Sequence, residues 1–94
     1  MHAAVFEATL AIPGAQSLKD KRMVVRSVKE RCRSRFGVSV VESGENDKWQ
    51  RCRLTFALAA VSESAARQGL QDITDFLYAD GRCEVIEIDT LVEE

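Results

Sequence analysis

The sequence predicts an α+β fold in which two helices cover one face of a four-stranded antiparallel sheet. Three observations lead to this class. Several segments alternate between apolar and polar residues, as half-buried strands do. Two other segments repeat their apolar residues with the period of a helix, and short turn sequences separate the elements. We expect one domain, 1–94, because no linker-like segment divides the chain.

Residues 2–12 form the first predicted strand, since one apolar set occupies every second position. A Pro-Gly pair then breaks the strand. The first helix is predicted over residues 17–37. Ser17 can accept hydrogen bonds from its free N–H groups, and Gly37 can adopt the left-handed conformation that ends it.

This first helix has two faces of opposite character. Its apolar arc, which should pack on the core, contains Leu18, Val24, Val25, Val28, Cys32 and Phe36. An adjoining set of cations recurs at spacings of three and four residues, and we call it the basic stripe: Lys19, Arg22, Arg26, Lys29 and Arg33.

Three cations, Lys19, Lys21 and Arg22, also lie in the first turn of this helix. The helix dipole disfavours each of them there by about 0.3–1 kcal/mol. A broken local rule can mark function, because cations beside free N–H groups would form an anion or phosphate site. The alternative is a solvated surface on which Asp20 and a nearby carboxylate neutralise the cations.

The second half of the chain repeats this layout. Residues 38–43 predict a short strand, a polar turn follows, and residues 51–61 alternate as a second long strand, antiparallel to its neighbour. A second amphipathic helix begins at Ser62 or Ser64 and runs to about Ala79. Its exposed side is mainly acidic, whereas that of the first helix is basic.

A last strand is predicted over residues 82–92, with Ile86 and Ile88 on one face. The resulting βαββαβ order is that of the ferredoxin-like sandwich, with both helices on one side of the sheet. Such an open outer face is either solvated or paired with another copy, and we expect a homo-oligomer through it. Its predicted residues are Val5, Glu7, Thr9, Ser39, Val41, Thr55, Ala57, Val85 and Glu87.

Charge is distributed unevenly along the chain. The net charge is only −2, which argues against a general nucleic-acid binder. Residues 17–37, however, hold eight Lys or Arg and two acids, a net charge of +6, which leaves −8 on the rest. This polarity suits an anionic partner or head-to-tail association of copies.

The three cysteines, Cys32, Cys52 and Cys83, are widely spaced among apolar residues and predict free buried thiols in a reducing compartment. The first residues lack the pattern of a signal peptide, and no segment is apolar enough to span a membrane. We therefore expect a cytoplasmic location and no membrane partner.

Catalytic and ligand motifs are not recognisable. The one histidine, His2, begins a strand and is poorly placed for a triad. The acids Glu42, Glu45 and Asp47 lack a calcium-loop pattern, and no phosphate-binding glycine motif occurs. The loop over residues 13–16 lacks the arginine among glycines of an acylphosphatase. We expect no enzyme activity, no cofactor and no metal.

Trp49, the one tryptophan, lies among the cations Lys48, Arg51 and Arg53. An aromatic ring in such surroundings can stack on a nucleobase. The alternative is that the indole closes one end of the core or forms an oligomer contact. The central strands lack outward aromatic residues, so any contact with RNA should use the first helix rather than the sheet.

The segments SLKDKRMVVRSVKERCRSRF, GVSVVESGENDKWQRCRLTFALAAVS and EVIEIDT resemble the YlxP-like family of bacterial domains, DUF503. The resemblance implies a ferredoxin-like fold, a tendency to oligomerise and no assigned enzyme activity. Members are often encoded beside translation initiation and ribosome-maturation factors, which implies an association with the ribosome. The most specific residues are Leu18 to Arg22, Arg35, Phe36, Val38 to Val40, Glu42 and Asp47 to Gln50.

Three hypotheses follow from the sequence. The first is a non-enzymatic RNA- or ribosome-associated module that places the basic stripe and Lys21 against phosphates, with Trp49 as a candidate contact. The second is a homo-oligomeric structural or protein-interaction module, whose basic helix meets an acidic protein surface. The third is a small-ligand or enzyme site in the loop between the first strand and the first helix.

Overall fold

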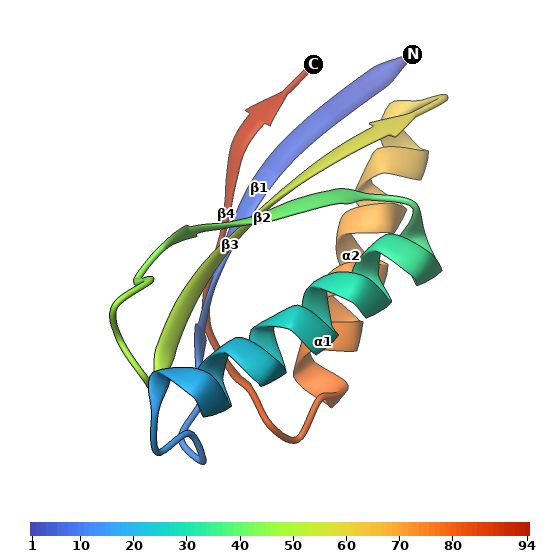
Figure 1. Ribbon diagram of the computed structural model, residues 1–94. Coiled ribbons are helices and arrows are strands. Elements are labelled where there is room, and N and C mark those ends of the chain that lie inside the picture. Colours follow the sequence, from blue (N-terminus) through green and yellow to red (C-terminus); the bar gives the residue numbers. More distant parts are fainter.

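The computed structural model describes residues 1–94 and confirms the ferredoxin-like fold (Figure 1). The antiparallel sheet has the order β2-β3-β1-β4, so the first and third strands are central, as expected. Both helices cover one face, and the other face carries no helix (Figure 1). The elements are β1 (His2–Ala11), α1 (Leu18–Phe36), β2 (Ser39–Gly44), β3 (Arg51–Ala60), α2 (Glu63–Ala79) and β4 (Glu84–Glu93).

The helix ends follow from local chemistry and confirm the predicted caps. The Ser17 hydroxyl accepts a hydrogen bond from the Asp20 N–H at 3.1 Å, and the Asp20 carboxylate accepts one from the Gln16 N–H at 3.1 Å. Gly37 ends α1 in the left-handed conformation, with φ of 61°. In α2 the N-cap is Ser62, whose hydroxyl accepts an N–H bond at 3.2 Å.

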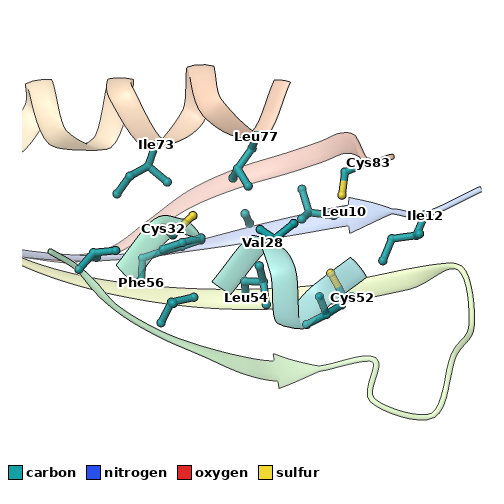
Figure 2. Close-up of a cluster of buried hydrophobic side chains, with 14 of the residues drawn as sticks. Leu10, Ile12, Val28, Cys32, Cys52, Leu54, Phe56, Ile73, Leu77 and Cys83 are labelled. Atoms are coloured by element: carbon teal, nitrogen blue, oxygen red, sulfur yellow. The ribbon is translucent and has the colours of Figure 1, made fainter. Parts of the chain in front are cut away.

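The core lies between the helical layer and the inner face of the sheet. Figure 2 shows Ile73 and Leu77 pointing from α2 toward the strands, with Val28 of α1 beside them. Within the sheet, Phe6 of β1 and Phe56 of β3 are paired neighbours, and their rings stack with centroids 4.9 Å apart. Alternation in the two central strands therefore predicted the inward side chains correctly.

The alternation predicted for β4 is wrong at the start of that strand. Val85 pairs with Leu10 and packs against the core, and Ile86, predicted to face inward, is exposed. The cause is a β-bulge. Between the pairs Leu10–Val85 and Thr9–Glu87, β4 contains one residue more than β1, so its faces shift relative to a regular strand.

Replacing Phe56 by Ala should lower the free energy of unfolding by about 3–5 kcal/mol, because its fully buried ring would leave a cavity against Phe6. Tyr78→Ala is the matched control, since this α2 aromatic is 66% exposed and should lose less than about 0.5 kcal/mol. Urea denaturation measures both variants. Equal losses in the two variants would contradict the assigned inner face of β3.

Candidate functional site

The basic stripe runs along the side of α1 that borders β2. Its side chains are exposed except that of Lys29, which is half-buried. None of the five forms an ion pair with a carboxylate of the chain. The carboxylate of Asp20 bonds instead to the backbone N–H of Gln16. The stripe is therefore an uncompensated positive surface rather than an internally neutralised one.

Arg33 has a second contact that sets it apart from the other members of the stripe. Its guanidinium donates a hydrogen bond to the backbone carbonyl of Val40 in the edge strand β2, at 2.7 Å. That carbonyl is thereby occupied, which helps to protect the edge from pairing with a foreign strand. Arg33 therefore holds α1 against β2 while part of its charged group stays exposed.

The prediction that Lys21 joins the basic stripe is wrong. Only 1% of Lys21 is exposed, so its ammonium cannot reach a phosphate. The Nζ atom donates to the backbone carbonyl of Glu45 at 2.6 Å and lies 2.8 Å from Glu42 Oε2, an ion pair rather than an aligned hydrogen bond. Burying an ammonium is costly unless such partners surround it, and these contacts fix the first turns of α1 to β2 and the following loop.

The loop between β2 and β3 is held on both sides. Glu45 adopts a positive φ of 62°, and its carboxylate lies 3.0 Å from the Lys48 ammonium, whose hydrogen bond lowers the pKa of Glu45 below its usual range. At the other side, the Gln50 amide donates to the carbonyls of Pro13 and Ala15, at 3.2 and 3.0 Å. The loop is therefore tied to the β1–α1 connection.

This tied loop presents Trp49 to solvent. The side chain is 53% exposed, and neither an aromatic ring nor a guanidinium stacks on it. Trp49 is not a member of the buried core, so it does not close one end of it. Lys21 and Gln50 bring its loop to the start of α1, where Lys19 begins the basic stripe. An open indole thus lies at the same end of the molecule as the first stripe cation.

A second cationic strip on α1 is absent from the sequence predictions. Arg31 and Arg35, one helical turn apart, line two neighbouring hollows of about 370 and 310 Å³ beside Phe76 of α2. The Arg35 guanidinium lies 5.7 Å from the ring centres of both Phe36 and Phe76. The i, i+4 spacing of the two arginines was a visible signal, but it did not reveal that the strip faces α2.

Other residues weighed as chemical groups do not gather into a catalytic or metal cluster. His2 lies 3.5 Å from Glu93, at the start of β1 and the end of β4. No group of three or more His, Cys, Asp or Glu side chains is arranged to hold a metal ion. No helix is both long and apolar enough to cross a membrane.

The three thiols are buried and free, as predicted. Burial raises the pKa of Cys32 and Cys83 to about 11, and burial together with the nearby Cys83 and Glu42 raises that of Cys52 to about 12. Near neutral pH these groups are protonated and poorly nucleophilic.

A disulfide-exchange thiol reagent should therefore modify none of the cysteines of the native chain near neutral pH. After denaturation in guanidinium chloride it should modify all three. Absorbance of the released reagent counts the thiols in both states. Rapid labelling of one native cysteine would show that its surroundings open more readily than this packing allows.

Breaking the buried pair tests the structural role of Lys21. Lys21→Met should destabilise the chain by about 2–4 kcal/mol, somewhat below the cost for fully buried pairs because the Glu42 side chain is 17% exposed. Glu42→Gln should lose less in the Lys21→Met background than in the wild type, with a coupling energy of about 1–3 kcal/mol. Urea denaturation of the four chains gives this double-mutant cycle.

Lys48→Met is the control for that cycle, because the Lys48 side chain is 58% exposed and its ion pair should contribute less than about 1 kcal/mol. Additive losses at Lys21 and Glu42, or a Lys21→Met effect no larger than the control, would mean that the pair is not a stabilising connection.

Together, the fold and this surface define a small ferredoxin-like domain with one strongly basic helix. Residues 3–90 match the family described as "Protein of unknown function (DUF503)", and the chain belongs to that family. It is similar to the "Uncharacterized protein YlxP" of Bacillus subtilis (strain 168), with 38% identity over 73 residues, which cover 76% of this chain and 77% of that protein. The family resemblance read from the sequence is confirmed.

Proposed function

We propose that the chain is a non-enzymatic RNA-binding module, active on ribosomal or other structured RNA, and that the basic stripe of α1 contacts the phosphates. The observation that carries the proposal is the absence of any carboxylate partner for the five stripe side chains. Cations left unpaired on a chain with a net charge of −2 keep a concentrated positive field on one surface.

The arrangement of the stripe suits a polyanion better than a single small anion. Lys19, Arg22 and Arg26 lie on successive turns, so their charges are spread along α1 and meet a row of phosphates. Release of counterions from such a row supplies the binding free energy and makes it strongly dependent on salt.

Trp49 supplies a contact of a different kind. Its exposed indole lies on the loop that Lys21 and Gln50 hold at the start of α1, so an unpaired base beside the bound phosphates can stack on it. The outer sheet face does not offer this, since its central positions include Val5 and Ala57 rather than aromatic residues. RNA contact is therefore assigned to the helical side of the molecule.

The test compares two variants with the same change in net charge. Arg22→Gln with Arg26→Gln removes two stripe cations, whereas Ser64→Glu with Ala65→Glu adds two acids to the first turn of α2, where the dipole favours them. Arg33 is left intact because it also binds Val40. Co-sedimentation with purified small ribosomal subunits, and binding to a structured RNA hairpin, are measured across a salt series.

The wild type should bind with a steep salt dependence. Loss of two phosphate contacts should reduce the slope of log K against log salt by about 1.4–1.8 in the stripe variant, with little change in the control. Equal weakening of both variants, or binding insensitive to salt, would overturn the proposal. Failure of the wild type to bind either RNA, with stripe-dependent capture of an acidic protein, would favour the interaction-module alternative.

A further inference from the structure

The open face of the sheet is divided into an apolar half and a charged half. Paired positions place Ser39, Ala57, Val5 and Val92 in one row across all four strands, with the small Ala3 and Ala59 beside them. Of these, Val92 is one of the exposed large apolar side chains. Small and apolar residues on this half permit close approach of a second flat surface.

The other half of this face carries opposite charges on its two flanking strands. Arg51 and Arg53 of β3 pair with Ala11 and Thr9 of β1, and the same two β1 residues pair on their far side with acids of β4. These acids are Glu84 and Glu87. Cations therefore lie along β3, acids along β4, and short side chains along β1 between them.

From this pattern we propose that the outer face binds a second copy of the chain, as a two-fold symmetric dimer whose axis runs along β1 between the two stacked sheets. Such an axis places β3 of one protomer over β4 of its partner at the same height along the strands. Arg51 then faces the partner's Glu84, Arg53 faces the partner's Glu87, and Val5 meets the partner's Val5. Each polar contact occurs twice because the interface is self-complementary.

Charge selects this arrangement over the other symmetric way to stack the sheets. An axis perpendicular to the strands would place β4 over the partner's β4 and bring like-charged carboxylates together. Like charges that face each other across an interface are strongly unfavourable. Arg51, Glu84 and Glu87 form no ion pair within the chain, so all three are free to pair across the dimer.

The size of the face fits a reversible dimer. The three overlapping strands have ten residues each, and at about 4.8 Å between strands and about 3.3 Å per residue they cover roughly 500 Å² per protomer. The two faces together reach about 1,000 Å², the size at which specific interfaces begin. We therefore expect association that is lost on dilution, rather than an obligate dimer.

The dimer leaves the RNA-binding proposal independent. Both helices lie on the side of the sheet away from the interface, so two copies of the basic stripe would remain exposed on opposite faces of the dimer (Figure 1). Arg51 and Glu84 lie outside α1. Their substitution therefore tests the dimer without removing stripe cations.

The experiment is a reciprocal charge exchange, followed by sedimentation velocity over a broad range of protein concentrations. The wild type should shift from monomer to twice the monomer mass. Arg51→Glu alone and Glu84→Arg alone should each weaken association about tenfold, because both symmetric pairs become repulsive. An equal mixture of the two variants should recover association as a heterodimer, since every pair across that interface again joins opposite charges.

Both substituted residues are exposed, and unchanged circular dichroism and melting temperature verify that each variant is folded. A wild type that stays monomeric at the highest concentration would overturn the proposal. So would a dimer that neither reversal weakens, because the interface would then lie elsewhere. Weakening by each variant without recovery in the mixture would overturn the pairing of β3 with the partner's β4.

Discussion

The contact on which the surface geometry most depends is the one made by the buried ammonium of Lys21. Its bonds to Glu42 and to the carbonyl of Glu45 join the start of α1 to β2 and to the loop that follows it. Gln50, at the end of that loop, then ties it to the β1–α1 connection. The position of Trp49 and the direction of the basic stripe both follow from these bonds, although neither takes part in them.

Features decided by neighbouring residues could be predicted from the sequence. Ser17 and Gly37 cap α1 through bonds within one helical turn, and alternation set the inner faces of β1 and β3. The burial of Lys21 has a sequence signal as well, because it precedes Val25 by four residues and so lies on the apolar side of the helix. Its partner Glu42 is distant in sequence, and charge alone gives a lysine the appearance of a surface residue.

Features decided by pairing between distant segments could not be predicted. The phase of β4 depends on a bulge opposite β1, and nothing local to residues 84–88 specifies where the additional residue falls. The same limit applies to the candidate surface. Spacing alone placed Arg33 among the phosphate contacts, but only the fold reveals its bond to Val40, and only the packing of α2 gives Arg31 and Arg35 a separate setting. Helical spacing reports the angle around an axis and not the neighbour at that angle.

The bulge in β4 has a consequence for changes in chain length. Ile86 is the residue that β1 does not match, so its deletion would leave Val85 opposite Leu10 and Glu87 opposite Thr9 in a regular ladder. Deletion elsewhere within a strand would turn every following side chain to the wrong face. Position 86 is therefore the point at which β4 can accommodate a length difference among relatives without exchanging its inner and outer residues.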